Sequence, residues 1–390
     1  MTARFQTTTG SGGGLWPSVR AMLLSAKWLP LALVFITIAI VFNIGTDGIF
    51  LSPRNLSLLM RQSAITAILA MAVSILIIKG EIDLSIGSSV FLCGTLAATL
   101  QVSYQMDVAS TLAITLALGL LLGLWQGLWV VALGVPSFVV TLGGLLGFRG
   151  LGYYLTDAAT IAPMSESYRM LSEGFVPKEY SLIVIGVTCL LLCALHVTSG
   201  KDSDTGVFRT GRVATRVGVT LAVGAGLAWI FTGYKGIPNA VIWVAVCGAI
   251  LWFVMSRTVF GRTAYLIGSN REAARLAGID VKRQLLFGFL LMGAFYAIAA
   301  ILMTARLSAS TPANGQYLEL DAIAAAVIGG VSLRGGMGSV IGAVAGAVLL
   351  MAIDNGMSLL NISSFLQMVI KALLLLFALL TDSLYNARRS

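Results

Sequence analysis

Charged side chains are scarce in this chain, because Asp, Glu, Lys and Arg together make up only 11% of its 390 residues. A soluble domain usually carries about 25% charged residues. The chain is instead 58% apolar, with a mean hydropathy of +0.94. This composition excludes a soluble enzyme, a disordered chain and a disulfide-rich secreted domain. It indicates a protein that crosses a membrane several times.

Residues that catalyse reactions or bind metals are also few. The four cysteines all lie in apolar runs, where a thiol behaves as a small hydrophobe, and His196 is the single histidine. No H-E-x-x-H zinc motif and no G-x-x-x-x-G-K-[ST] phosphate-binding loop occurs. We therefore expect no catalytic residue, no metal ligand and no cofactor bound by this chain. If ATP powers its activity, the ATPase is another chain.

Twelve apolar segments follow one another, most of them near the ~20 residues that a helix needs to span the hydrocarbon of a bilayer. They comprise residues 29–50, 62–79, 84–102, 108–133, 137–155, 180–199, 213–232, 239–256, 284–305, 319–333, 337–354 and 364–381. The predicted fold class is therefore an all-α polytopic membrane protein with about twelve transmembrane segments.

Basic residues predict how these segments are oriented. A net charge of +9 would suggest a nucleic-acid partner in a soluble protein, but here the charges lie between apolar runs, where basic loops mark the cytoplasmic side. We expect no nucleic-acid partner, and we place loop 257–283, with its six Lys and Arg residues, in the cytoplasm. An even number of segments then places both termini there. The expected parts are a cytoplasmic tail over 1–28, a single transmembrane domain over 29–382 and a cytoplasmic tail over 383–390.

Two segments differ from ordinary spans. Segment 84–102 opens with a Ser- and Gly-rich stretch, and segment 319–333 is short, acidic at its start and ends soon after two glycines. Irregular backbone inside a membrane is tolerated only where it is buried in protein or lines a cavity. We predict broken or re-entrant helices at both places. The pathway candidates are Asp83, Ser85, Gly87, Asp321, Gly329, Gly330 and Ser332.

Ionisable residues in membrane segments are functional candidates by default. Four acidic residues lie at segment ends, where an interfacial position is expected; they are Glu81, Asp83, Glu319 and Asp321. Arg149 and Lys371 lie inside segments and are expected to snorkel or to pair with an acid, with a contact to a transported molecule as the alternative. Residues 80–88 also resemble residues 329–339 weakly, and the sequence leaves open whether this is an internal repeat.

The most informative polar stretch lies in loop 257–283. Asn270 suits the N-cap of a short helix, Glu272 falls in its first turn, and Gly278 can end it in a left-handed conformation. A short helix between two spans can present a compact knob to a partner, or it can rest on the lipid surface as an amphipathic linker. The residues assigned to this knob are Gly268, Asn270, Glu272, Ala273, Ala274, Leu276 and Gly278.

Three stretches resemble one known family. Residues 267–279, IGSNREAARLAGI, are similar to the coupling-helix motif of permease subunits of bacterial sugar ABC importers, in the ribose, galactose and xylose branch that belongs with the branched-chain amino-acid permeases. Residues 80–88, GEIDLSIGS, resemble the family signature G-G-I-D-L-S-V-G-S, and residues 320–333 resemble its second signature. The resemblance covers roughly residues 55–385. Segments 180–232 look like the extra material of the xylose members.

The chain departs from the family pattern at two places. Glu81 stands where the family commonly has glycine. Ser269-Asn270-Arg271 replaces the more usual Gly-Asn-Glu or Gly-Asn-Pro. The first departure changes the packing of its loop, and the second changes the charge at the knob and bears on the choice of ATPase.

The resemblance implies a permease subunit of an ATP-driven importer of a monosaccharide, with D-xylose as the expected substrate, in the bacterial inner membrane. It implies a second copy of this chain, two copies of a cytoplasmic ABC ATPase or one fused tandem ATPase that holds ATP and Mg, and a periplasmic sugar-binding protein. Because that protein selects the sugar, tight sugar binding by this chain is not expected, and few polar groups converge along its segments. The alternatives are a permease for ribose, galactose or a nucleoside, an ATP-independent secondary transporter, and a membrane enzyme or scaffold.

Overall fold

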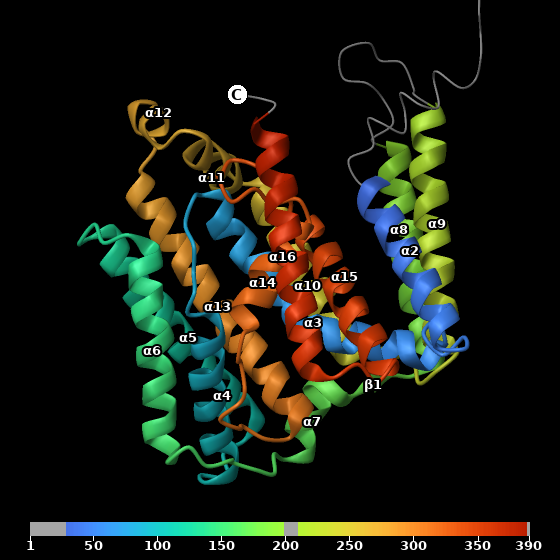
Figure 1. Ribbon diagram of the computed structural model, residues 1–390, viewed down its shortest axis with the longest axis horizontal. Coiled ribbons are helices and arrows are strands. Elements are labelled where there is room, and N and C mark those ends of the chain that lie inside the picture. Colours follow the sequence, from blue (N-terminus) through green and yellow to red (C-terminus); the bar gives the residue numbers. More distant parts are fainter. Residues whose placement is uncertain (1–28, 199–209, 388–390) are drawn as a thin grey trace, which may run out of the picture.

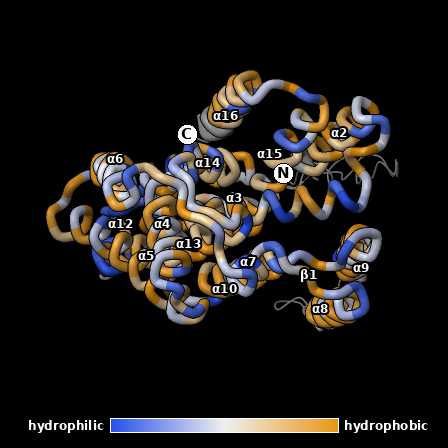
Figure 2. The backbone as a smooth tube through the Cα atoms, turned by 90° about the horizontal axis from the view of Figure 1, so that it is seen from below, coloured by the Kyte–Doolittle hydropathy of each residue, from blue (hydrophilic) through white to orange (hydrophobic). Residues whose placement is uncertain are grey.

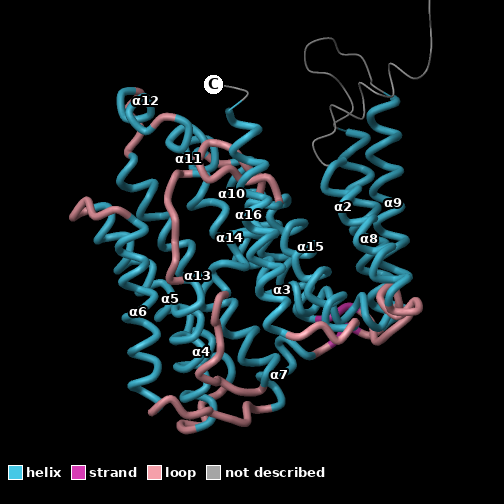
Figure 3. Tube along the Cα trace, in the orientation of Figure 1, coloured by secondary structure: helices cyan, strands magenta, loops and turns pink. Residues whose placement is uncertain are grey.

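A computed structural model describes residues 29–198 and 210–387. The expected tail over 1–28 and the last three residues of the tail over 383–390 lie outside the described residues. Where the structure describes the chain, it is almost entirely helical (Figures 1 and 3). The helices are α2 (Leu29–Gly45), α3 (Pro53–Ile78), α4 (Ile86–Val102), α5 (Val108–Val131), α6 (Ser137–Thr156), α7 (Glu166–Glu173), α8 (Lys178–Thr198), α9 (Thr210–Thr232), α10 (Asn239–Arg257), α11 (Val259–Ser269), α12 (Arg271–Leu276), α13 (Val281–Leu307), α14 (Leu318–Ile328), α15 (Val340–Leu359) and α16 (Ser364–Ala387). Strands β1 (Phe175–Val176) and β2 (Ile237–Pro238) pair antiparallel.

The membrane segments match the predicted ones. In the described residues, eight helices are long and apolar enough to cross a membrane: α3, α5, α6, α8, α9, α10, α13 and α15. Shorter apolar helices occur in α2, α4 and α16, and α14 has 11 residues. Each of the twelve predicted segments thus contains one helix, and the all-α polytopic class is confirmed. Figure 2 shows hydrophobic residues along the helices and hydrophilic ones in many of the connecting segments.

Both ends of the described chain lie on one side of the molecule, as an even number of spans requires. In Figure 1 the start of α2 and the end of α16 lie on the same side of the molecule as α12. Short helix α7 lies at the opposite end. We refer to these as the α12 side and the α7 side. Helices α8 and α9 pack on each other and expose most of their apolar side chains, as lipid-facing helices do.

Helix α3 forms the centre of the core. Ser52 caps its first turn by accepting a hydrogen bond from the Asn55 N–H, and Pro53 occupies the first helical position, where no N–H is needed. Every residue from Ser63 to Lys79 is buried. The helix begins nine residues before the predicted segment 62–79, because the polar residues of its first turns interrupt the apolar pattern.

Helices α5 and α13 approach each other through glycines. A Cβ atom on Gly123 would lie 2.3 Å from the Phe289 carbonyl oxygen, and one on Gly293 would lie 2.3 Å from the Gly119 carbonyl oxygen. Small residues four apart let the backbones of membrane helices make direct van der Waals contact. These glycines therefore set the distance between α5 and α13.

Gly123→Val is expected to destabilise the protein by about 1–3 kcal/mol, because the two backbones must separate to admit the side chain. Gly147→Val on α6 is the matched control, since nothing lies within 4 Å of a Cβ atom at Gly147. Thermal unfolding of both variants in the same detergent measures the difference. Equal melting temperatures would mean that the α5–α13 contact does not depend on glycine.

Two helices start inside the molecule, as predicted. Residues 81–85 form a loop that leads to α4, and the irregular segment 308–317 leads to α14 (Figure 3). The two starts meet, because a Cβ atom on Gly87 would lie 2.0 Å from the Gly315 carbonyl oxygen. Helix α4 then runs toward the α7 side and α14 toward the α12 side (Figure 1). This opposed pair is typical of transporters with inverted repeats. In this structural pairing, residues 81–85 before α4 correspond to residues 308–317 before α14. The weak sequence resemblance paired residues 80–88 with residues 329–339 instead.

Candidate functional site

Helix α12 is a small exposed projection built by local signals. The Asn270 side chain accepts a 2.9 Å hydrogen bond from the Ala273 N–H, and Gly278 has a φ of +80°. The predicted N-cap and the predicted C-terminal glycine are both confirmed. Arg275 donates to Glu272 at 2.8 Å, a contact that raises the pKa of the Arg275 guanidinium. Ala274 is buried, whereas Leu276 is 79% exposed on the α12 side.

The segment before α12 is fixed to two other motifs. A Cβ atom on Gly268 would lie 1.7 Å from the Ile78 carbonyl oxygen, so only glycine fits there. That same carbonyl accepts a 2.8 Å hydrogen bond from the Gly336 N–H. Tyr265 donates to the Gly338 carbonyl at 3.1 Å, and burial raises the pKa of its hydroxyl. The end of α3, the segment before α12 and the loop after α14 therefore meet at one point.

An ion pair joins the two positions at which the sequence departs from the family pattern. The Arg271 guanidinium donates to the Glu81 carboxylate. The Glu81 side chain is 6% exposed and that of Arg271 is 52% exposed. The sequence shows Glu81 and Arg271 only as two separate differences from the family pattern. Their opposite charges were the only signal that could have predicted a contact between them.

Lys79 lies beside this ion pair at the end of α3. It is buried, donates to the Gln284 carbonyl and lies 3.7 Å above the centre of the Phe260 ring. Lys79, Glu81 and Arg271 line a cavity of about 650 Å³, which we call the inner cavity.

Asp83 anchors a buried polar network at the start of α4. It accepts 2.8 Å hydrogen bonds from the Ser85 N–H and hydroxyl, and the Tyr296 hydroxyl also donates to it. Gln126 donates to the Ser85 hydroxyl, so α5 and α13 both hold the broken helix. Asp83 is 0% exposed, so this acid is buried inside the protein. Sequence reasoning missed Gln126 and Tyr296, since each is a single polar residue in an apolar run.

The glycines after α14 pack closely against α15. A Cβ atom on Gly329 would lie 2.1 Å from the Gly342 carbonyl oxygen on α15. Gly330 has a φ of +91°, and the Ser332 N–H donates to the Met337 carbonyl at 3.1 Å. These residues form a tight turn on the α12 side, and within the described part of the chain they do not line the inner cavity.

Asp321 belongs to an internal charge triad. Lys371 on α16 contacts Asp354 on α15 at 2.6 Å and Asp321 on α14 at 3.3 Å. The expectation that Lys371 pairs with an acid is confirmed, and Asp321 is one of its two partners. Arg149 donates to the backbone carbonyls of Pro312 and Asn314, at 3.3 and 3.0 Å, and its charge also acts on the nearby Glu319 carboxylate.

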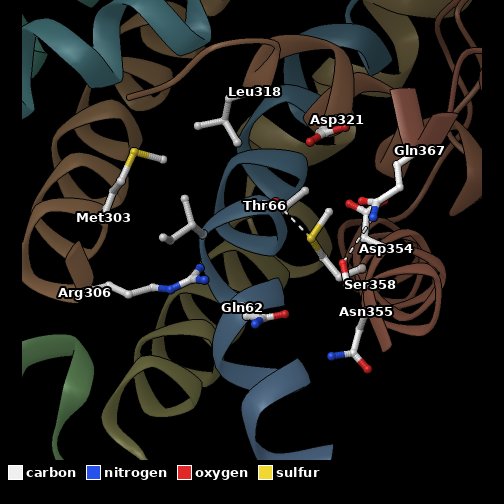
Figure 4. Close-up of a pocket in the computed structure, with 12 residues that line it drawn as sticks. Gln62, Thr66, Met303, Arg306, Leu318, Asp321, Asp354, Asn355, Ser358 and Gln367 are labelled. Atoms are coloured by element: carbon white, nitrogen blue, oxygen red, sulfur yellow. Dashed lines mark hydrogen bonds between the residues drawn. The ribbon is translucent and has the colours of Figure 1, made fainter. Parts of the chain in front are cut away.

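A second cavity of about 350 Å³ lies beside this triad, and we call it the outer cavity (Figure 4). Its walls come from α3, α13, α14, α15 and α16. The lining residues are Gln62, Ile65, Thr66, Met303, Arg306, Leu318, Asp321, Met351, Asp354, Asn355, Ser358 and Gln367. Few converging polar groups were expected from the sequence, and this cavity corrects that expectation. The groups were missed because each helix contributes only one to four residues.

A family profile described as "Branched-chain amino acid transport system / permease component" matches residues 55–379. The chain belongs to this family. The permease is 41% identical to the "Xylose transport system permease protein XylH" of Escherichia coli (strain K12) over 360 residues, 90% of this chain and 91% of the relative. It is 39% identical to XylH of Haemophilus influenzae, with coverage of 91% and 96%. The "Ribose import permease protein RbsC" of Bacillus subtilis is 31% identical, with coverage of 90% for each chain. No solved structure matches the permease.

The family match spans the permease from α3 to α16, so it includes both broken helices, α12 and both cavities. The relatives are permease components of transport systems. Together with the apolar helices, this makes the chain a multi-pass membrane protein with a transport role.

Proposed function

We propose that this chain is the permease subunit of an ATP-driven ABC importer that moves D-xylose across the bacterial inner membrane. The observation that carries the proposal is α12, an exposed helix whose preceding segment is fixed to the end of α3 and to the loop after α14. The 41% identity to a xylose transport permease supports the substrate.

The proposed assembly contains two copies of this chain. Two cytoplasmic ABC ATPase subunits, or one fused tandem ATPase, dock on α12 and hold ATP and Mg, and a periplasmic protein delivers the sugar on the α7 side. Closure of the ATPase moves α12 as a rigid body. Because Gly268 contacts the end of α3 and the loop after α14, that movement reaches the segment that leads to α4 and the segment that follows α14. Asp83, Ser85 and Gly87 on one side and Asp321 on the other are the proposed pathway positions.

The test is uptake of radiolabelled D-xylose into vesicles that contain this chain with its ATPase and its periplasmic protein. ATP-dependent uptake that requires all three supports the proposal. Uptake of ribose, galactose or a nucleoside instead would keep the class and change the substrate; ribose is the principal alternative, since a ribose permease is 31% identical. Uptake by the chain alone without ATP would make it a secondary transporter.

Glu272→Lys is expected to leave the permease folded and to reduce ATPase co-purification at least tenfold. It reverses the charge in the first turn of α12 and breaks the exposed contact to Arg275. Glu166→Lys is the matched control, because Glu166 is also exposed in the first turn of a short helix but lies on the α7 side. Normal retention of the ATPase by Glu272→Lys would contradict the docking role of α12.

A further inference from the structure

The outer cavity lies away from the proposed ATPase contact. Helix α13 begins near α12, and Arg306 occupies its last turn, close to the α7 side (Figure 1). Gln62 lies in the first half of α3, which starts on that same side. A volume of about 350 Å³ falls within the ~300–1,000 Å³ range of small-molecule sites. The cavity is therefore large enough for a monosaccharide and lies toward the side from which one would arrive.

Several polar groups in this cavity are not used by the protein itself. Asp354 bonds Lys371 through one oxygen, while its Oδ1 atom is buried with no hydrogen-bond partner among the described residues. In the same part of the chain, the Arg306 guanidinium makes no hydrogen bond and no ion pair, and neither does the Gln62 amide. Figure 4 shows Arg306 extending toward Gln62 and Thr66 from one wall, with Asp354 on the facing wall. A buried carboxylate oxygen without a hydrogen bond is costly, and the partly buried Arg306 and Gln62 side chains leave donors open toward the cavity.

The charges around the cavity balance. Lys371 neutralises part of the field of Asp321 and Asp354, and Arg306 lies near a second pair, Arg61 with Glu173 at 3.0 Å. The lining itself carries one base, Arg306, and two acids, Asp321 and Asp354, and Lys371 offsets one acidic charge from behind the wall. These charges sum to about zero, so neither a free cation nor a free anion finds an uncompensated opposite charge there. The arrangement therefore favours a neutral ligand that both donates and accepts hydrogen bonds.

The remaining wall is apolar. Ile65, Met303 and Leu318 belong to the lining, and Figure 4 shows Met303 on the side of the cavity across from Asp354. A sugar ring has one face of C–H groups and an edge of hydroxyls, so it presents an apolar surface and polar groups together. Hydroxyls can donate to Asp354 and accept from Arg306 while the ring lies against Met303 and Leu318.

We propose that the outer cavity is a binding site for a neutral monosaccharide within a single copy of the permease. That the monosaccharide is D-xylose rests on the proposed function. It holds the sugar between α3 and the broken helix α14, at the level where the pathway leaves the α7 side. Because its walls include α14, a bound sugar contacts one of the elements that α12 moves.

The test uses the purified full chain in lipid nanodiscs, without ATPase or periplasmic protein. Saturation-transfer difference NMR with D-xylose is expected to show binding by the wild type. Arg306→Gln and Asp354→Asn are expected to reduce the signal at least fivefold. Arg54→Gln is the matched control, since Arg54 is an exposed arginine on the first turn of α3. Met303→Trp fills the cavity without changing its charge and is expected to abolish the signal.

Full binding by Met303→Trp, or no xylose signal from the wild type, would overturn the site. The size-exclusion profile of each variant shows whether it is folded, and Met303→Trp keeps the test decisive if the charge variants misfold. Failure of the site and failure of the proposed function are distinguishable. ATP-driven xylose uptake without binding here refutes the site alone, and xylose binding here with ATP-independent uptake refutes the importer alone.

Discussion

Arg271→Glu is expected to lower ATP-driven sugar uptake at least tenfold while the chain still inserts in the membrane. The substitution places a second carboxylate beside Glu81, whose side chain is only 6% exposed. Like charges at that distance repel, and Glu81 loses the partner that offsets its burial. The loop before α4 then separates from the segment before α12, so the motion of α12 no longer reaches the broken helix.

The loss of stability is expected to be smaller than the loss of transport. Breaking a fully buried ion pair costs about 3–5 kcal/mol. Arg271 is 52% exposed, so solvent screens the pair, and we expect about 2 kcal/mol. Arg283→Glu is the matched control, because the Arg283 side chain is 82% exposed and pairs only with nearby Asp280.

A double-mutant cycle separates the pair from its surroundings. Glu81→Gln and Arg271→Gln are each expected to reduce uptake, and the double variant is expected to recover most of it, since no unpaired charge remains. ATP hydrolysis measured alongside uptake distinguishes uncoupling from poor assembly. Additive losses in the double variant would show that the two side chains act independently and would remove the ion pair from the coupling path.

Local signals were sufficient to predict α12. Its N-cap, its first-turn acid and its terminal glycine lie within nine residues, and each acts on the backbone next to it. The broken helices were predicted for a similar reason, because a polar or glycine-rich interruption of an apolar run is visible within a few residues. The first turns of α3 were missed, since Arg54, Asn55 and Arg61 break the apolar pattern although the cap before them is strong.

The polar networks required contacts between distant residues. Asp83 and Tyr296 are 213 positions apart, and Arg271 and Glu81 are 190 apart. Gln62, Arg306 and Asp354 come from three different helices and are far apart in the sequence. Hydropathy averages such residues away, and a single sequence does not show which of them face one another. For this reason the outer cavity was not predicted, whereas the segments that form its walls were.

Lys371→Met is expected to leave most of the protein molecules unfolded. The Lys371, Asp321 and Asp354 side chains are 26%, 21% and 20% exposed, and the two carboxylates would lose their shared partner. Removing one member of a buried charge group costs about 3–5 kcal/mol. That is a large part of the ~5–15 kcal/mol by which folded proteins are stable. Lys178→Met is the matched control, because Lys178 is exposed at the start of α8.

The cost is expected to arise from the unpaired acids and not from the missing lysine. A triple variant, Lys371→Met with Asp321→Asn and Asp354→Asn, removes all three charges, so it should recover most of the folded protein. Fluorescence-detected size-exclusion chromatography after heating gives the folded fraction of each variant. If the triple variant is as unstable as Lys371→Met, the lysine stabilises the helices by packing its long aliphatic chain, and the triad is not an electrostatic unit. If it recovers, α14, α15 and α16 are held together by charge, at the wall of the outer cavity.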